Sequence, residues 1–361
     1  MITTVILVLI AIPVIALVLF IVAMRAVQKG TSANRYYGQP FAERQRIKRE
    51  LAERGRRLIP LIRFVSYLPR KIPTVRFRGM LTPKHSTSAS SVRAAAAYKP
   101  DTRDVFVATQ MKCGTTWMQQ VAYQVCMRGR GDCSDAGHGH IQATSPWIES
   151  DNGVPLADAP RFGPEGLRVI KTHLPADICP YSPDARYIYV TRNPAACFAS
   201  AVDFVRLGAG MLSPSRAQLL DWFLCERMWW RSWPEHVDGY WRLAEQHSNV
   251  LFVHYEAMLA DLPGTISKVA TFLNIPLNAE ELAEVSRKSS FAFMKEHEEQ
   301  FEMTPPSLLS AQAPKSFMPG GTRDREREGE PEERRRIMEF CADRLKNGAY
   351  PLQRFYPERD S

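Results

Sequence analysis

A lysine, a glycine and two threonines follow a short apolar run in the most strongly patterned part of this sequence. The run begins at Asp104 and predicts a buried strand, and a helix is expected from Thr115 to about Met127. A strand–loop–helix junction of this kind presents backbone N–H groups and the positive end of a helix dipole to an anion. Lys112 adds a mobile positive charge, and Gly114 lets the backbone approach a ligand closely. The junction therefore predicts a phosphate-binding loop.

The next side chains favour a nucleotide over a free anion. The hydroxyl groups of Thr115 and Thr116 add hydrogen-bond donors, and Trp117 offers a flat face on which a base could stack. The loop is not a Walker A motif, which has a lysine directly after the second of two glycines, because here the lysine lies two residues before a single glycine. An ordinary strand–turn–helix with a threonine cap would give the same local pattern without any ligand.

Two further junctions carry charged side chains where strands end. A strand over Leu167–Lys171 leads into His173, and a strand over Ala185–Thr191 leads into Arg192. The carboxyl ends of parallel strands lie at one edge of a sheet, where α/β proteins bind their ligands. A lone histidine at a strand end is more often structural than catalytic. Lys171 lies two residues before His173 on the same strand face, however, and this pairing favours a general base with an ordinary pKa near ~6.5.

The positive charge of the chain is concentrated near its N-terminus. The whole chain has a formal net charge of +9, whereas residues 25–72 contain thirteen Lys or Arg and three Glu, a net +10, so the remainder sums to −1. The high overall charge is therefore no evidence for nucleic-acid binding, and no nucleic-acid partner is expected. The basic residues directly follow residues 2–24, an uncharged apolar segment of 23 residues that is long enough to cross a hydrocarbon core of about 30 Å.

We interpret residues 1–24 as a retained single-pass membrane anchor, with a cleaved signal peptide as the alternative, because no Lys or Arg precedes Arg25. The positive-inside rule then places the catalytic domain in the cytoplasm. Residues 41–57 are expected to form a basic helix that lies against anionic headgroups, or else a solvated linker helix. The predicted division of the chain is an anchor (1–24), a basic juxtamembrane segment (25–72), a linker (73–103) and a catalytic domain (104–361).

Scattered cysteines and clustered aromatic residues give weaker signals. The seven cysteines form no C-x-x-C pair, so no metal site is expected. Cys113 in the anion loop is interpreted as a small filler, with a reactive thiol as the alternative. A helix over Leu219–Gln246 is expected to break at Pro234, and its many aromatic residues are expected to pack in the core.

Together, these motifs resemble the PAPS-dependent sulfotransferases, especially the cytosolic small-molecule type. Residues 112–117 are similar to that family's 5′-phosphosulfate loop, with a cysteine in place of the usual serine, and residues 171–175 (Lys-Thr-His-Leu-Pro) match its catalytic strand end. Arg192, with Ser200 eight residues later, resembles the family's 3′-phosphate motif. The residues that resemble its adenosine-side contacts are Tyr255, Ser289 and Phe291. The matches occur in family order over about residues 100–320.

The resemblance implies a three-layer α/β fold like that of the P-loop NTPases, with a central, mostly parallel sheet preceded here by one transmembrane helix. It implies PAPS as co-substrate, no metal, and in-line transfer of the sulfuryl group to a hydroxyl of a small-molecule or lipid-like acceptor. His173 would be the general base, and Lys112 and Lys171 would stabilise charge on the bridging oxygen. The residues implied to bind the nucleotide are Lys112, Cys113, Gly114, Thr115, Thr116, Trp117, Arg192, Ser200, Tyr255, Ser289, Phe291, Gly321 and Arg323.

The chain departs from the family at the loop that closes on the 3′-phosphate. The family has Phe-Met-Arg-Lys-Gly there, whereas residues 317–321 read Phe-Met-Pro-Gly-Gly. Loss of the basic pair weakens the expected phosphate clamp, and Arg323 or Lys315, which flank the loop, are the candidates to replace it. The family's dimerisation motif is not evident near this point, so the oligomeric state stays open.

Three alternatives remain. The first is a lumenal or exported carbohydrate sulfotransferase, with the catalytic domain on the far side of the membrane. The second is a P-loop kinase-like nucleotide-binding protein, which the order of lysine and glycine in the anion loop disfavours. The third is a catalytically inactive relative that keeps the nucleotide site.

Overall fold

The computed structural model describes residues 11–15, 17, 18, 21, 36–60, 63, 73–303 and 330–357 of the chain. Within these residues, a central sheet of four parallel strands has the order β4-β3-β5-β6. The strands are β3 (Asp104–Thr109), β4 (Arg168–Thr172), β5 (Arg186–Thr191) and β6 (Val250–His254). This confirms the predicted α/β fold with a parallel sheet.

Strands β3 and β4 are buried along their whole length because helices cover both faces of the sheet. All six residues of β3 and all five of β4 are buried, which is typical of strands in a parallel sheet between two layers of helices. The register aligns the strand ends: Ala108 pairs with Thr172, and Thr191 pairs with His254. The loops that follow β3, β4 and β5 therefore leave the same edge of the sheet.

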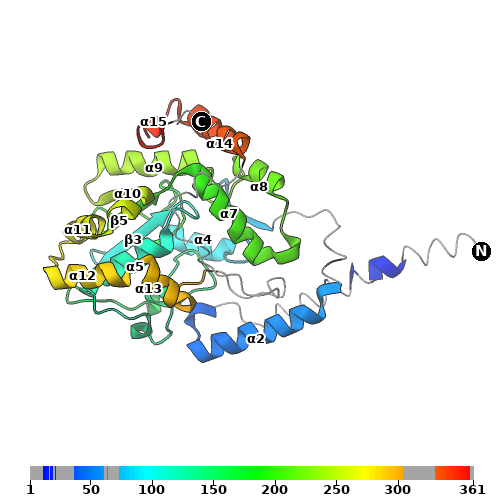
Figure 1. Ribbon diagram of the computed structural model, residues 1–361, viewed down its shortest axis with the longest axis horizontal. Coiled ribbons are helices and arrows are strands. Elements are labelled where there is room, and N and C mark those ends of the chain that lie inside the picture. Colours follow the sequence, from blue (N-terminus) through cyan, green and yellow to red (C-terminus); the bar gives the residue numbers. More distant parts are fainter. Residues whose placement is uncertain are drawn as a thin grey trace, which may run out of the picture.

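Helices cover the sheet in two layers (Figure 1). On one face, Val105 and Val107 pack in a core cluster with residues of α5 (Thr115–Cys126), α11 (Leu262–Phe272) and α12 (Ala279–Lys288). On the other face, Phe106 and Ala108 share a core cluster with α7 (Pro194–Ala209), α9 (Trp233–Gln246) and α14 (Pro331–Leu345). The result is the three-layer arrangement that the family resemblance implies.

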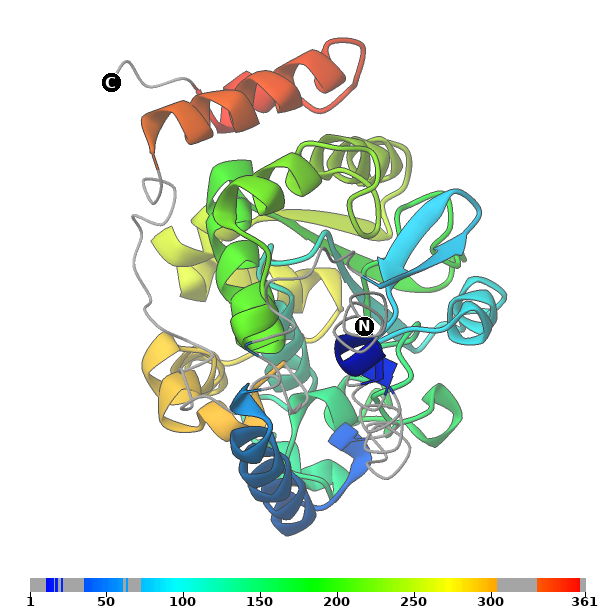
Figure 2. The same cartoon turned by 90° about the vertical axis from the view of Figure 1, so that its right-hand side faces the viewer.

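Residues 73–103, predicted to be a linker, contain regular structure. Strands β1 (Thr74–Phe77) and β2 (Met80–Pro83) form an antiparallel hairpin, and α4 (Ala89–Ala96) follows it (Figure 2). Helix α4 begins with a capping box at Ser88, and Met80 and Val92 are buried in the main core. The short lengths of these elements explain why their periodicity was too weak to predict them.

Two helical predictions are confirmed in part. The helix expected over Leu219–Gln246, with a break at Pro234, is two helices, α8 (Arg216–Phe223) and α9; the break lies just before Pro234, which occupies the first turn of α9, where proline is favoured. The basic helix α2 (Phe41–Arg57) forms as predicted, but it packs on the body of the protein. Its Arg44 is only 2% exposed and donates hydrogen bonds to the carbonyl oxygens of His138 and Gly139.

Most of the predicted membrane anchor at residues 1–24 lies outside the described residues. In the part of the chain that the structure describes, no helix has the length and apolar character needed to span a bilayer. The described residues of this segment include exposed apolar side chains at Ile12, Val14, Ile15, Val18 and Ile21.

Candidate active site

The predicted anion loop joins β3 to α5 in an unusual backbone conformation. Lys112 and Gly114 both have positive φ values, +66° and +104°. A Cβ atom at Gly114 would lie 2.6 Å from Cδ2 of Tyr255, so only glycine fits between the loop and this ring. The Nζ atom of Lys112 lies 4.7 Å from the ring centroid of Phe204. The loop therefore brings a lysine, a helix N-terminus and an aromatic ring to one point.

His173 follows β4 and has a fixed orientation beside this loop. Its Nδ1 atom lies 2.8 Å from the carbonyl oxygen of Thr109. A carbonyl can only accept a hydrogen bond, so Nδ1 carries the proton and Nε2 carries the lone pair. Burial and the neighbouring Lys171 hold the pKa of His173 well below its usual value. The imidazole is therefore neutral at physiological pH and can accept a proton at Nε2.

Two tryptophan rings enclose the imidazole of His173. The centroid of Trp147 lies 5.2 Å from it in an edge-on arrangement, and that of Trp230 lies 4.8 Å from it. Trp230 and the next residue, Arg231, have left-handed φ values of +57° and +73°, which are uncommon for large side chains. The side-chain amide of Gln110 stabilises this turn by donating a hydrogen bond to the carbonyl oxygen of Trp229. Local backbone strain of this kind is typical of functional sites.

Lys171, near the end of β4, is a buried lysine next to the histidine. Its Nζ atom lies 4.0 Å from the ring centroid of Trp147. Burial lowers the pKa of Lys171 to about 7, the charge of Glu149 opposes this shift, and the charge of Lys112 adds to it. The two predicted catalytic lysines therefore act on each other, as groups that share one site do.

Arg192 connects the third junction to the first. Its guanidinium carbon lies 4.3 Å from the ring centroid of Tyr255, and Nη1 donates to the carbonyl oxygen of Lys112 over 3.5 Å. Asn193 caps α7 by accepting hydrogen bonds from two backbone N–H groups. Ser200 lies further along α7 and is half-buried. The predicted sites for the two anionic groups of the nucleotide are thus adjacent.

Three of the predicted adenosine-side residues, Trp117, Tyr255 and Ser289, meet at the start of α5. Trp117 donates its indole N–H to the carbonyl oxygen of Ser289 over 2.7 Å, and its ring lies edge-on to Tyr255 at 5.3 Å. The hydroxyl oxygen of Ser289 is buried and has no hydrogen-bond partner among the described residues. Phe291 starts α13 (Phe291–Glu296) and is 43% exposed. An unsatisfied hydroxyl beside an aromatic ring suits a polar, planar ligand.

The threonines and Cys113 of the loop have different environments. Thr115 shares a hydrogen bond of 2.6 Å with Thr109, while Thr116 is half-buried. Cys113 is fully buried, its sulfur lies 3.2 Å from that of Cys197, and burial raises its pKa well above the usual value. These observations support the interpretation of Cys113 as a filler. Gly321, Arg323 and Lys315 lie outside the described residues.

Sequence reasoning missed Glu149, Trp147 and Trp230. Trp230 was assigned to the core with its neighbours; it is buried, but it also contacts His173. Glu149 and Trp147 lie in a stretch with little pattern, and no local signal indicated their role. Residues 73–303 and 330–357, with the few described residues before them, contain no group of three His, Cys, Asp or Glu that could hold a metal ion.

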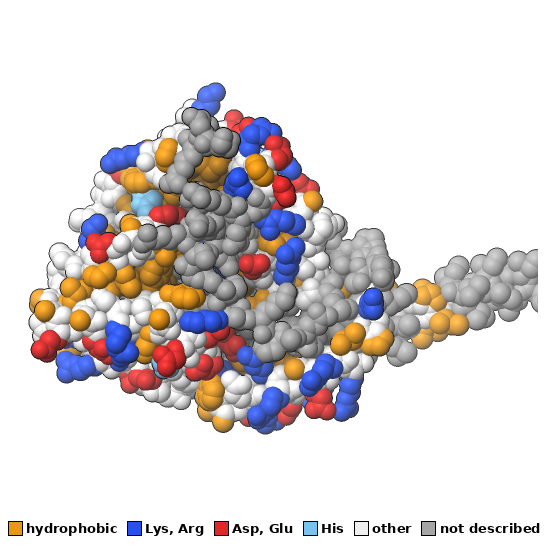
Figure 3. Space-filling view, viewed as in Figure 1, with side chains coloured by type: hydrophobic (Ala, Val, Ile, Leu, Met, Phe, Trp, Pro, Cys, Tyr) orange, Lys and Arg blue, Asp and Glu red, His pale blue; other side chains and the backbone are white. Residues whose placement is uncertain are grey.

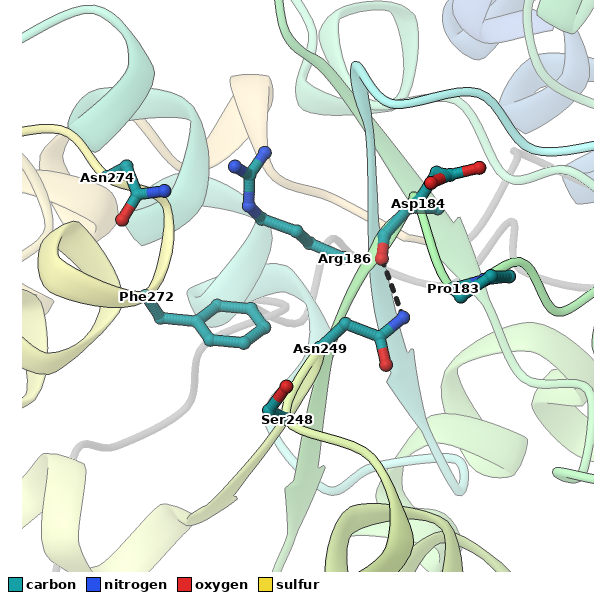
Figure 4. Close-up of a pocket in the computed structure, with 8 residues that line it drawn as sticks. Pro183, Asp184, Arg186, Ser248, Asn249, Phe272 and Asn274 are labelled. Atoms are coloured by element: carbon teal, nitrogen blue, oxygen red, sulfur yellow. Dashed lines mark hydrogen bonds between the residues drawn. The ribbon is translucent and has the colours of Figure 1, made fainter.

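A surface depression of about 260 Å³ lies away from this site (Figure 4). It is lined by residues at the starts of β5 and β6, including Arg186 and Asn249, and by Phe272 and Asn274 at the end of α11; the amide of Asn249 donates to the carbonyl oxygen of Ala185. These strand starts lie at the edge of the sheet opposite the anion loop. On the face shown in Figure 3, acidic and basic side chains are interspersed, in keeping with the nearly neutral body.

Residues 102–348 match the family model described as the sulfotransferase domain. The chain belongs to the sulfotransferase family. Human sulfotransferase 2B1 is 31% identical over 256 residues, which cover 68% of this chain and 67% of the relative. Rat sulfotransferase 1C2 is 30% identical over 233 residues, 62% of this chain and 76% of the relative. The family confirms the predicted enzyme class: this sulfotransferase catalyses sulfuryl transfer, and the kinase-like alternative is not favoured.

Solved structures have the same fold. Retinol dehydratase in complex with androsterone and the inactive cofactor PAP has a TM-score of 0.62 at 22% identity, and covers 78% of this chain and 92% of its own. Mouse sulfotransferase SULT7A1 complexed with PAP has a TM-score of 0.57 at 22% identity, with coverages of 76% and 96%. Both of those solved structures are complexes with PAP.

Proposed function

We propose that this enzyme transfers the sulfuryl group of PAPS to a hydroxyl group of a small, largely apolar acceptor, with His173 as the general base. The observation that carries the proposal is the arrangement at one edge of the sheet. His173 is held through Nδ1 with Nε2 available, and Lys171 lies beside it. A fixed base with a lysine beside it is the arrangement that in-line transfer to a hydroxyl group requires.

The nucleotide would lie across the loops that follow β3 and β5. Lys112 and the N-terminus of α5 suit the 5′-phosphosulfate, because both favour an anion. Arg192 suits the 3′-phosphate, since a planar guanidinium matches phosphate oxygens. Trp117 and Tyr255 suit the adenine, because their rings meet at the start of α5.

The transfer step needs a base and positive charge, both of which the site supplies. The acceptor oxygen forms a bond to sulfur as its proton passes to Nε2 of His173, and the bond from sulfur to the bridging oxygen of PAPS breaks. The electron pair of that bond stays on the phosphate of PAP. Lys112 and Lys171 would stabilise this developing charge, so the chain's own cations serve the role that a metal ion has in many phosphoryl transfers.

The aromatic residues around His173 support a flat, apolar acceptor. Trp147 and Trp230 contact the imidazole, and Phe204 lies under Lys112. Rings in this arrangement favour fused-ring or phenolic alcohols over hydrated sugars. A guinea-pig 3-alpha-hydroxysteroid sulfotransferase that is 33% identical over 200 residues supports the same class of acceptor.

The binding experiment compares PAP with ATP by calorimetry, using the wild type, Lys112→Met and Arg192→Met. The account expects PAP to bind in the presence of EDTA, each substitution to weaken PAP by roughly 10-fold or more, and ATP to bind poorly. Arg227→Met, at an arginine outside the site, is the control. Equal affinity of all four proteins for PAP would refute the proposed nucleotide site.

The proposed clamp on the 3′-phosphate includes residues that the structure does not describe. We propose that Arg323 or Lys315 replaces the basic pair that the family has in this loop. Arg323→Ala and Lys315→Ala are expected to weaken PAP binding singly or together. If the double variant binds PAP as the wild type does, neither residue holds the phosphate.

We also propose that residues 1–24 anchor the enzyme in a membrane with the catalytic domain in the cytoplasm. The support is the uncharged apolar stretch followed by basic residues from Arg25 onward. A fluorescent reporter fused to the C-terminus and protease protection of sealed vesicles both test the topology. Protection of the C-terminal domain inside the secretory lumen would favour the lumenal alternative instead.

A further inference from the structure

A buried carboxylate, Glu149, lies directly behind the catalytic strand end. It is 0% exposed, and both of its oxygens accept hydrogen bonds from that segment. Oε1 accepts from the backbone N–H of His173 over 2.6 Å, and Oε2 accepts from the hydroxyl of Thr172 over 3.0 Å. The hydroxyl oxygen of Thr172 in turn accepts from the N–H of Leu174 over 3.0 Å. One side chain therefore fixes three consecutive residues.

The backbone of His173 is held from the opposite side as well. Its carbonyl oxygen accepts a hydrogen bond from Nε2 of His236 over 3.0 Å. His236 is itself held by the hydroxyl of Tyr189, 3.0 Å from its Nδ1. With its N–H bound to Glu149 and its carbonyl bound to His236, the main chain of His173 cannot shift without breaking one of these contacts.

The segment that carries Glu149 runs alongside β4. The N–H of Ile148 donates to the carbonyl oxygen of Lys171 over 3.0 Å, and the N–H of Lys171 donates to that of Pro146 over 2.9 Å. This pairing places Trp147 against the ammonium group of Lys171. The same few residues thus supply a ring to the catalytic lysine and a carboxylate to the catalytic histidine.

Glu149 also provides negative charge where positive groups gather. Among the described residues, the titratable groups that act on Lys171 include Glu149, Lys112, His140 and His173, while Lys171, Lys112 and His236 act on His173. Burial raises the pKa of Glu149, but hydrogen bonds from Thr172 and the His173 N–H favour its ionised form. A buried carboxylate with donors at both oxygens is a charge-assisted arrangement, which is stronger than neutral hydrogen bonds.

We propose that Glu149 is a positioning residue for sulfuryl transfer, which holds the main chain of His173 in place and adds a negative charge beside the strand end that carries Lys171. The catalytic part of this inference rests on the proposed function, whereas the effect on Lys171 does not. Removal of the charge should lower the pKa of Lys171, so that less of it is cationic at neutral pH.

The matched control is Glu256, a half-buried carboxylate that accepts a backbone N–H just after β5, as Glu149 does just after β4. Its Oε1 accepts from the N–H of Asn193 over 2.8 Å, and its Oε2 accepts from the hydroxyl of Tyr356 over 3.1 Å. Burial raises its pKa too, but it is not among the groups that act on Lys171. Glu149→Gln and Glu256→Gln therefore make the same chemical change at two different strand ends.

The first measurement follows the titration of Lys171 by NMR of the full chain labelled with ¹³Cε-lysine, with Lys171→Arg to assign the signal. In the wild type the midpoint is expected near 7. Glu149→Gln should lower it by about one pH unit, and Glu256→Gln should leave it unchanged. An unchanged midpoint in folded Glu149→Gln would overturn the charge role, whether or not the enzyme transfers sulfate.

The second measurement separates charge from position. At pH 7.5, a one-unit fall in the pKa of Lys171 reduces its cationic fraction by about eightfold, so kcat/KM should fall on the order of 10-fold in Glu149→Gln.

Thr172→Val keeps the charge of Glu149 but removes the hydrogen bond to its Oε2. In this variant kcat should fall at least about threefold, with no change in the titration midpoint of Lys171. If Glu149→Gln does not fold by circular dichroism, Thr172→Val decides alone, and unchanged kcat there refutes the positioning role. Absence of transfer by the wild type would refute the proposed function instead.

Discussion

Replacement of Gly114 by alanine tests whether the anion loop and Tyr255 act as one unit. The new Cβ would lie 2.6 Å from Cδ2 of Tyr255, well inside an ordinary contact. Tyr255 cannot move alone, because its ring packs against the guanidinium of Arg192 at 4.3 Å and against Trp117 at 5.3 Å. The substitution should therefore displace both the predicted 3′-phosphate and adenine contacts.

The magnitude follows from overpacking and backbone strain. Forcing an extra methyl group into a packed site costs about 1–3 kcal/mol, which corresponds to a roughly 5- to 150-fold loss of PAP affinity if it falls on the bound state. The φ value of +104° at Gly114 adds about 1–2 kcal/mol of strain to the folded protein with or without nucleotide. Calorimetric titration with PAP and thermal unfolding measure the two contributions separately.

Gly137→Ala is the control for the strain. Gly137 has a similar φ of +77°, but no atom lies within 4 Å of the position of its added Cβ. It should lose a comparable amount of stability and keep its PAP affinity. The reasoning would be refuted if Gly114→Ala bound PAP within twofold of the wild type, because the ring contact would then have no consequence for the nucleotide.

Three other outcomes are expected. His173→Asn should reduce kcat by about 10²–10⁴-fold with little change in PAP affinity, and loss of both together would indicate a structural defect. The free energy of unfolding should fall as pH decreases from about 6.5 toward 4, because burial lowers the pKa of His236 to about 4. Neutral His236 contributes about 3 kcal/mol to stability above pH 6.5, and this contribution is lost over that range. His236→Asn should therefore make stability less dependent on pH between 6.5 and 4. Iodoacetamide should alkylate Cys225, which is half-exposed, long before buried Cys113, and rapid labelling of Cys113 in the folded protein would restore the reactive-thiol alternative.

The sequence could predict the catalytic groups because each follows its own strand. Lys112, His173 and Arg192 are far apart along the chain, yet a parallel sheet brings the carboxyl ends of its strands to one edge. Local patterns of buried residues were enough to find β3, β4 and β5, and the strand ends then determined where the three charged junctions meet.

Contacts between distant segments could not be predicted in this way. Glu149 lies 24 residues before His173 in a stretch without periodicity, and only its pairing alongside β4 brings it to the histidine. Arg44 belongs to a highly charged helix and was expected at a lipid or water surface, but carbonyl oxygens near His138 provide enough acceptors to bury it. Trp230 reaches His173 because of a left-handed turn that its sequence does not indicate.

The most direct test of the central claim is transfer of labelled sulfate from PAPS to a panel of steroid, phenol and membrane-lipid alcohols in the presence of EDTA, by the wild type and by His173→Asn. The account predicts labelled sulfate ester with the wild type on at least one apolar alcohol and at least a 100-fold lower rate with His173→Asn. Equal rates for the two proteins, with PAP binding intact in both, would contradict the assignment of His173 as the base.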